Sequence, residues 1–214
     1  MVTKSIAMKS FAEFITGTEA ARKRILRGYK YPDDEGMAMA KYYWPAKSTI
    51  AIFHQNCHSI EWLLEKASEL EKHSLSPSKS LRTKMLSNAR SLRSYAKYFG
   101  CTKFEVLGTG KFPFHLGGVT INVTPDIHVV DTLGKETYIK YNFSQKKMKY
   151  EYVRAIIGCM SYGVHVNLQT NSPDTVAFVD VPTGTVHQGI PVTDALRGEM
   201  IARCEELQDE WNAL

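Results

Sequence analysis

The chain has 214 residues, of which 43% are hydrophobic and 23% are charged. Such a length and composition are typical of a globular protein with a buried core. No segment reaches the roughly 20 consecutive apolar residues that a membrane-spanning helix needs, which excludes an integral helical membrane protein. Residues 1–9 also lack a continuous apolar segment of the kind found in secretion signals. We therefore expect a soluble, cytoplasmic protein without a membrane partner.

Charge is unevenly distributed along the chain. Residues 1–100 contain 17 Lys and Arg and 9 Asp and Glu, whereas residues 101–214 contain 10 and 13, so the net charge of +5 divides into +8 and −3. A basic half is compatible with binding to a polyanion such as a nucleic acid, although solvated charges on helix surfaces give the same numbers. The four cysteines form no CxxC pair, which favours reduced thiols over disulfides or a zinc ribbon.

Helices are expected to dominate the first 100 residues. Apolar residues recur there at helical spacing, Pro45 can begin a helix, Ser59 can cap one and Gly100 can end one. The expected helical segments are 10–30, interrupted at Gly17, then 37–56, 59–75 and 81–100. The first and last of these are rich in arginines that either contact phosphate groups or are simply solvated. These arginines are Arg22, Arg24, Arg27, Arg82, Arg90 and Arg93.

The apolar pattern changes from helical spacing to alternation after Cys101, which indicates strands. We expect strands within 102–118, 119–131, 135–143 and 174–182, a helix at 149–164, a loop or hairpin up to Pro191, and an acidic helix at 193–214. This order predicts an α+β fold with a central mixed sheet of about four strands flanked by helices. A basic helical N-terminal part (1–78) would pack on an α/β core with a C-terminal helix (79–214) as one compact unit.

A hairpin within residues 119–143 carries the candidate site. In the segment DTLGK, residues 132–134 have the length of a three-residue loop, and Gly134 suits its left-handed last position. Counting outward from this loop predicts cross-strand pairs on one face of the sheet. The pairs are Asp126 with Lys140, His128 with Tyr138, and Val130 with Glu136. A loop of different length would place Asp126 and Lys140 on opposite faces, so the site depends on this register.

The order helix, three strands, helix and strand resembles the PD-(D/E)XK nuclease superfamily over about residues 80–181, with Pro125-Asp126 on the second strand and Lys140 on the third. In that superfamily an Asp and an acid-x-Lys on adjacent strands hold Mg²⁺, and the lysine positions the attacking water. The resemblance implies a restriction-endonuclease-like core with Asp126 as a metal ligand and Lys140 as the water-positioning cation. Carboxylate oxygens suit Mg²⁺ or Mn²⁺, and such a metal polarises the phosphodiester.

The chain as a whole also resembles a family of bacterial proteins. This resemblance rests on the segments FAEFI, PDIHVVD, IKYNF and FVDVPTGTVHQG. It implies one fold over nearly the full length, and it implies no particular activity.

The chain departs from the nuclease pattern at Tyr138, which stands where an active nuclease presents an acid. A phenol is neutral at pH 7 and a poor Mg²⁺ ligand. The second acid could instead be Glu136, on the same face as Lys140, or one of Asp131, Glu105, Glu61 and Glu65. Asp126 and Glu136 would then be the metal ligands, with His128 and Tyr138 lining the same face. Otherwise Asp126 and Lys140 form a cross-strand ion pair on a half-exposed sheet face.

Two classes of function follow from these patterns. The first is a nucleic-acid-binding protein with a PD-(D/E)XK-like core, either a divergent Mg²⁺-dependent nuclease or a relative that has lost catalysis. The second is a non-catalytic protein-interaction or regulatory module on a degenerate nuclease scaffold, in which the basic helices bind an acidic protein. A metal site in the segment HQNCH is a further alternative, since His54, Cys57 and His58 could face one ion, but it has no evident fourth ligand.

Overall fold

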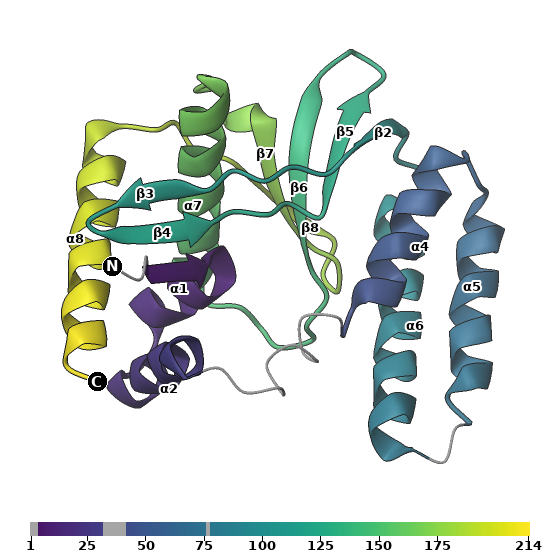
Figure 1. Ribbon diagram of the computed structural model, residues 1–214. Coiled ribbons are helices and arrows are strands. Elements are labelled where there is room, and N and C mark those ends of the chain that lie inside the picture. The colour runs from purple at the N-terminus through teal and green to yellow at the C-terminus, as the bar shows by residue number, and fades with distance from the viewer. Residues whose placement is uncertain (1–3, 32–41, 76–77) are drawn as a thin grey trace.

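A computed structural model describes residues 4–31, 42–75 and 78–214. Within these residues, helices surround a five-stranded and a three-stranded sheet (Figure 1). The expected α+β class is therefore confirmed, with more strands than the four expected. None of the helices in the described residues is both long enough and apolar enough to span a membrane.

The helices follow the local signals in the sequence. Their bounds are α1 Met8–Thr16, α2 Glu19–Lys30, α4 Trp44–Gln55, α5 Ile60–His73, α6 Lys79–Phe99, α7 Tyr150–Leu168 and α8 Asp194–Asn212, with a short 3₁₀ helix at Pro173–Thr175. Pro45 lies in the first turn of α4, the Ser59 side chain accepts a hydrogen bond from the Trp62 N–H, and α6 ends at Gly100, as expected. The part of the expected helix 37–56 that precedes Tyr42 lies outside the described residues.

The strands form two separate sheets. Their bounds are β1 Lys4–Ala7, β2 Phe104–Gly108, β3 Phe114–Leu116, β4 Val119–Asn122, β5 Ile127–Asp131, β6 Glu136–Asn142, β7 Val176–Asp180 and β8 Thr185–Gln188. The large sheet has the order β2-β5-β6-β7-β8, in which only β6 and β7 are parallel, and the small sheet has the order β1-β4-β3. Helix α7 connects the two parallel strands, as a crossover between parallel strands requires.

The expectation of a single strand over 119–131 is wrong. This segment forms β4 and β5, which belong to different sheets. Pro125, which lies between them, has no N–H to donate to a ladder. Ile121 packs in the core beside the small sheet, whereas Ile127 packs in a second core under α4, α5 and α6. The alternation that suggested one strand therefore combines two buried faces that contact different partners.

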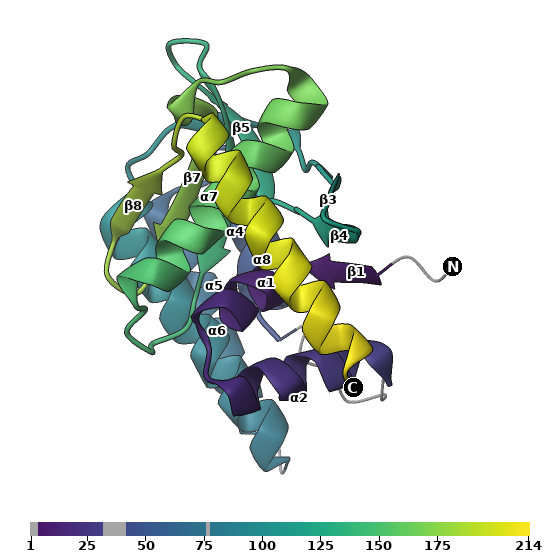
Figure 2. The same ribbon diagram turned by 90° about the vertical axis from the view of Figure 1, so that its left-hand side faces the viewer.

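Both faces of the large sheet are covered. One face, which includes Ile127, Ile139 and Tyr141, packs against α4, α5 and α6. The other face, which includes Tyr138 and Phe178, belongs to the core formed by α1, α7, α8 and the small sheet. Figure 2 shows α8 as an outer layer on this side, lying across the molecule in front of α7. Asp126 and Lys140 thus lie in a largely buried part of this face, with side chains 7% and 12% exposed, whereas Glu136 near the hairpin turn is 58% exposed.

The N-terminal part expected over residues 1–78 packs as two pieces. Helices α1 and α2 contact α7 and α8, whereas α4 and α5 contact α6 (Figure 1). Strand β1 also pairs in parallel with β4, so the first described residues complete the small sheet. The two pieces pack on opposite faces of the large sheet, so a residue from each piece can reach the start of β5.

Asn88 on α6 fixes the beginning of α4. Its fully buried side chain accepts a hydrogen bond from the Ala46 N–H (2.9 Å) and donates to the carbonyls of Tyr42 (2.9 Å) and Lys84 (2.8 Å). No acidic side chain lies in the first turn of α4, so an amide from another helix caps it instead. This contact determines where the first turn of α4, including Lys47, lies relative to the sheet.

We expect Asn88→Ala to lower the free energy of unfolding by about 2–4 kcal/mol, because buried backbone groups of Ala46 and Tyr42 would lose their partner. Chemical denaturation would measure this loss. Ser91→Ala is the matched control, since Ser91 is also buried on α6 but bonds only within its own helix, to Ser87 O. Equal losses in the two variants would contradict the capping role of Asn88.

Candidate anion-binding site

The register of the hairpin is as expected. Asp131 N donates to Lys135 O at 3.0 Å, Gly134 has a φ of +79°, and His128 pairs with Tyr138. One step further along, Asp126 N donates to Ile139 O at 2.8 Å. Asp126 and Lys140 therefore lie together at the beginning of β5, where Lys140 Nζ is 3.0 Å from Asp126 Oδ1.

A second lysine contacts the same carboxylate. Lys47 Nζ, from the first turn of α4, is 2.7 Å from Asp126 Oδ1. The other oxygen, Oδ2, accepts a hydrogen bond from Tyr141 N at 2.9 Å, and Lys140 Nζ also donates to Thr124 O at 2.7 Å. The carboxylate thus accepts from two ammonium groups and one backbone N–H, which satisfies most of its hydrogen-bonding capacity.

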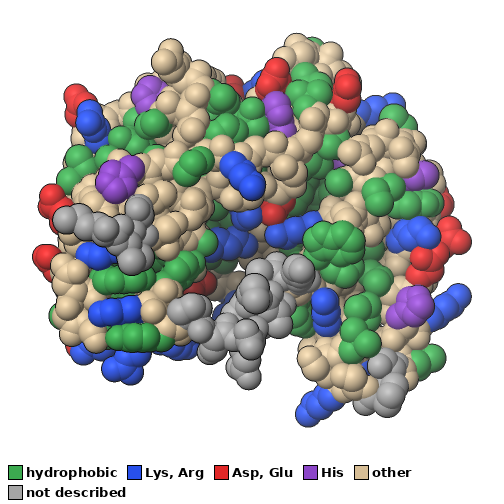
Figure 3. All heavy atoms as spheres, in the orientation of Figure 1, with side chains coloured by type: hydrophobic (Ala, Val, Ile, Leu, Met, Phe, Trp, Pro, Cys, Tyr) green, Lys and Arg blue, Asp and Glu red, His purple; other side chains and the backbone are tan. Residues whose placement is uncertain are grey.

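Lys9, from the first turn of α1, completes the group. Its Nζ donates to Tyr141 O at 3.4 Å, beside the peptide N–H that binds Asp126. Lys9, Lys47, Lys140 and Asp126 are called the lysine cluster below. Figure 3 shows Lys and Arg side chains gathered around a carboxylate at the centre of the face, between the small sheet and α4.

The cluster is largely buried. The exposed fraction of the side chain is 7% for Asp126, 12% for Lys140 and 30% for Lys47. Burial alone would raise the pKa of Asp126, but the Lys140 and Lys47 ammonium groups outweigh burial, so its pKa lies below the ordinary value. The carboxylate is therefore ionised at neutral pH, and it neutralises only one of three lysines.

The pKa values of two of the lysines show the effect of burial first and of the neighbouring positive charges second. Burial lowers the pKa of Lys9 to about 8, with further lowering by Lys140 and Lys47 and opposition from Asp126 and Glu13. Burial also lowers the pKa of Lys140, although Asp126 opposes this. Lys9 and Lys47 both come from first turns of helices that contain no acidic side chain, and the positive ends of these helix dipoles add to the charge.

The remaining residues expected at the hairpin site lie further along the strands. Glu136 is roughly 13 Å from the Asp126 end, since four residues at about 3.3 Å each separate it from Lys140 on β6. His128 Nε2 is 2.9 Å from Glu136 Oε2, and the His128 ring stacks on Tyr138 with centroids 4.0 Å apart. The structure therefore divides the expected set into the Asp126–Lys140 pair and a separate group of His128, Glu136 and Tyr138.

The donor set does not fit the metal site that the nuclease resemblance implies. Asp126 and Glu136 are too far apart to share an ion, and Lys47 and Lys140 already occupy Asp126 Oδ1. In the described part of the chain, no group of three or more His, Cys, Asp and Glu is placed to hold a metal. Excess ammonium charge would also repel a divalent cation. The arrangement suits an anion instead.

The environment of Tyr138 explains why no acid occupies its position. Tyr138 is 8% exposed, and its ring lies edge-on to Phe112 with centroids 4.6 Å apart and stacks on His128. Burial raises the pKa of its phenol. A carboxylate here would be buried among rings without a cation, which costs several kcal/mol, whereas a tyrosine packs.

The six expected phosphate-binding arginines do not form one surface. Arg22 pairs with Glu206 and Glu210, and Arg93 makes a two-pronged pair with Glu71, at 3.0 and 2.7 Å. The other four are exposed, Arg24 and Arg27 on α2 and Arg82 and Arg90 on α6. Helices α2 and α6 lie on different sides of the molecule (Figure 1).

Other candidates from the sequence have structural roles. His54 is buried, lies 2.8 Å from the Tyr95 hydroxyl and stacks on Phe104, while His58 stacks on Trp62. Burial lowers the pKa of His54 to about 4. These contacts account for both histidines of the HQNCH segment as packing residues.

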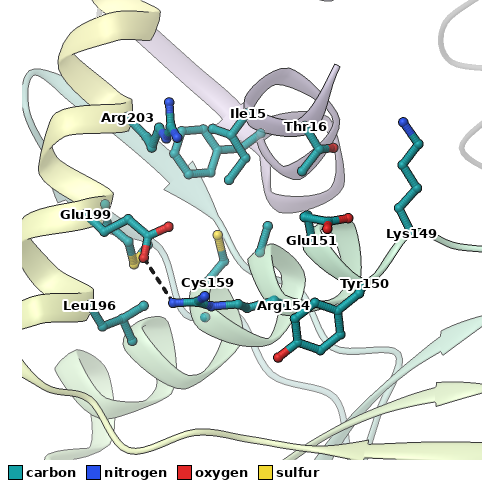
Figure 4. Close-up of a pocket in the computed structure, with 14 residues that line it drawn as sticks. Ile15, Thr16, Lys149, Tyr150, Glu151, Arg154, Cys159, Leu196, Glu199 and Arg203 are labelled. Carbon is teal, nitrogen blue, oxygen red and sulfur yellow. Dashed lines mark hydrogen bonds and ion pairs between the residues drawn. The ribbon is translucent and has the colours of Figure 1, made fainter. Parts of the chain in front are cut away.

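A separate cavity of about 620 Å³ lies between α1, α7 and α8. Figure 4 shows Arg154 reaching from α7 toward Glu199 on α8, and their charged atoms are 3.4 Å apart. Cys159 also lines it, and burial raises the pKa of this thiol far above its ordinary value. Because the thiol stays protonated, it is not an activated nucleophile. None of the cavity's lining residues belongs to the lysine cluster.

No family model matches the sequence, and no curated protein is significantly similar to it.

We expect Asp126→Asn to lower the free energy of unfolding by about 3–5 kcal/mol, because the Lys47 and Lys140 ammonium groups would lose the carboxylate that they contact in a largely buried site. Denaturant titration would measure the loss. Glu136→Gln, on the same hairpin but 58% exposed, is the control and should change stability by under about 0.5 kcal/mol. A loss of stability in Glu136→Gln but not in Asp126→Asn would contradict the role of Asp126 in the lysine cluster.

Lys9→Met should stabilise the protein by about 1–3 kcal/mol at pH 7, because it removes a buried charge near two others. In the wild type, native Lys9 releases its proton near pH 8, before the unfolded chain does near 10.5, so wild-type stability rises with pH across this window. The difference in free energy of unfolding between Lys9→Met and the wild type should therefore decrease as the pH rises from 8 to 10.5. Lys23→Met on α2 is the exposed control, and a Lys9→Met variant less stable than wild type at pH 7 would refute the expectation.

Proposed function

We propose that the protein binds nucleic acid through phosphate contacts at the lysine cluster. One observation carries this proposal: Lys47 and Lys140 contact a single carboxylate and Lys9 lies beside it, hydrogen-bonded to Tyr141 O, so a largely buried site holds more positive than negative charge. Such a charge costs stability unless an anion compensates it, and phosphate is the anion that nucleic acids offer in bulk. The uneven charge of the chain supports the same choice of ligand.

The order of elements expected from the PD-(D/E)XK resemblance supports a scaffold of this type. In the large sheet, β2, β5 and β6 follow α6 and precede α7 and β7, which is parallel to β6, while β3 and β4 of the small sheet lie between β2 and β5 in the chain. Asp126 directly precedes β5 and Lys140 lies on the neighbouring strand β6, which supports this part of the proposal. The Mg²⁺ chemistry is not part of the proposal, since the acid that would complete the metal site is not beside Asp126. On this proposal the scaffold binds phosphate with ammonium groups alone.

The exposed arginines form no single surface with the lysine cluster, but they add long-range attraction for a polyanion. Arg24 and Arg27 on α2 and Arg90 on α6 are available to steer a polyanion toward the cluster, and their contribution would fall with salt. In this arrangement the cluster is the largely buried anchor, and the helices add a weaker attraction.

A second candidate is the protein-interaction module. The helices of the α4–α6 side expose several large apolar side chains, namely Trp44, Leu64, Leu75, Leu81, Leu86 and Tyr98. Exposed apolar groups of this kind suit a protein partner. Binding of such a partner would depend weakly on salt, which separates the two candidates.

The test measures fluorescence anisotropy of labelled single- and double-stranded DNA and RNA over a series of salt concentrations, with EDTA or Mn²⁺ present. We expect affinity to fall steeply with salt, and Lys47→Gln to weaken binding about tenfold and to reduce the slope of log K against log salt by about one. Lys66→Gln removes the same charge from α5, where Lys66 pairs with Glu69, and should leave both quantities unchanged.

Two outcomes would contradict this function. Salt-insensitive binding to a protein but not to nucleic acid would favour the interaction module. Mn²⁺-dependent cleavage that disappears in Asp126→Ala would instead restore the nuclease expectation, and a second metal-binding acid would then have to be identified.

A further inference from the structure

We infer that the lysine cluster recognises a phosphate monoester, such as the phosphorylated end of a nucleic acid chain, and does so without a metal ion. This inference rests on the proposed function and names the group that the same site binds. It follows from the occupancy of the Asp126 oxygens, from the charge of the cluster and from its depth.

The first argument concerns the position that a metal would occupy. At Asp126 Oδ1, the Lys47 and Lys140 ammonium groups lie at 2.7 and 3.0 Å, and Oδ2 is held by the Tyr141 N–H. A divalent ion at Oδ1 would have to displace a lysine. Lys47 thus supplies the positive charge that a metal would otherwise bring to a phosphate, and its remaining N–H groups can donate to phosphate oxygens.

The second argument concerns charge. Three lysines and one carboxylate leave a net charge of +2 in the cluster, and a phosphate monoester carries about −1.5 to −2 at pH 7, whereas a phosphodiester within a strand carries −1. Glu13, one turn after Lys9 on α1, also faces Lys9, but it is exposed and is the weakest of the charges that act on that residue. The buried charge is therefore better matched by a monoester.

The third argument concerns depth. The exposed fraction decreases from 30% at Lys47 to 12% at Lys140 and 7% at Asp126, so the Lys140 end of the cluster lies below the surface. A phosphate inside a strand has a sugar on each side, and both would have to approach the residues that cover this end. A terminal phosphate has only one such neighbour, so it can reach deeper.

Lys9 provides an independent signature of binding. The charged groups near Lys9 are those of Lys47, Lys140, Asp126 and Glu13. Burial is the main reason why the pKa of Lys9 is lowered to about 8, and the two lysines lower it further. A bound dianion would favour the charged form and raise this pKa. At pH 8 the complex should therefore take up protons, and calorimetry in two buffers of different ionisation enthalpy would detect the uptake. Lys9→Met should abolish it.

The test compares one short oligonucleotide in three forms, with a 5′-phosphate, a 3′-phosphate or only hydroxyl ends, in EDTA and at fixed salt. We expect one phosphorylated form to bind at least about tenfold more tightly than the hydroxyl form. Lys47→Gln should remove this preference, Lys47→Arg should retain it, and Lys66→Gln should not affect it. The conservative arginine variant separates loss of charge from loss of folding.

The outcomes distinguish this inference from the function on which it rests. Equal binding of all three forms, still weakened by Lys47→Gln, would overturn the end recognition and leave nucleic-acid binding in place. No binding of any form by folded protein would overturn both. If inorganic phosphate or a mononucleotide competes at the same concentration as the oligonucleotide, the cluster is a site for small phosphate compounds rather than for nucleic acid ends. Loss of binding in EDTA would overturn the metal-free mechanism.

Discussion

The buried carboxylate of Asp126 is the constraint on which the centre of this molecule depends. An ionised carboxylate that is 7% exposed is tolerable only with close positive partners and hydrogen-bond donors. Its partners come from two distant parts of the chain: Lys47 on α4, and the adjacent residues Lys140 and Tyr141 on β6, which contribute an ammonium group and a backbone N–H. Asp126 thereby joins the α4–α6 helices to the sheet, while Lys9 brings α1 to the same point.

Two local features make this meeting possible. The three-residue turn with Gly134 at positive φ sets the register that places Asp126 opposite Lys140, and a slip of one residue would send one of them to the other face. Asn88 holds the first turn of α4 from α6, which places Lys47 over the carboxylate. Neither feature belongs to the cluster, yet the geometry of the cluster follows from both.

Local patterns in the sequence were sufficient for the helices, for the hairpin register and for the pair formed by Asp126 and Lys140. They failed for residues 119–131, because alternation reports that a face is buried but not which core buries it, and the two halves of this segment enter different cores. They also missed Lys9 and Lys47, which reach Asp126 only through tertiary packing. One signal did exist: a lysine in the first turn of a helix opposes the helix dipole and suggests an anion nearby.

The excess of lysines over carboxylates is the strongest reason to assign a function to this site. A purely structural ion pair would need one lysine for one Asp126, and additional buried ammonium groups lower stability, as the depressed pKa of Lys9 indicates. Charges that the fold does not need are expected where a ligand supplies the missing counterion. Tyr138 is consistent with the absence of a metal from this proposal, since a packed ring lies where a nuclease would carry an acid. On this view Asp126 keeps the lysines together, and the lysines hold the ligand.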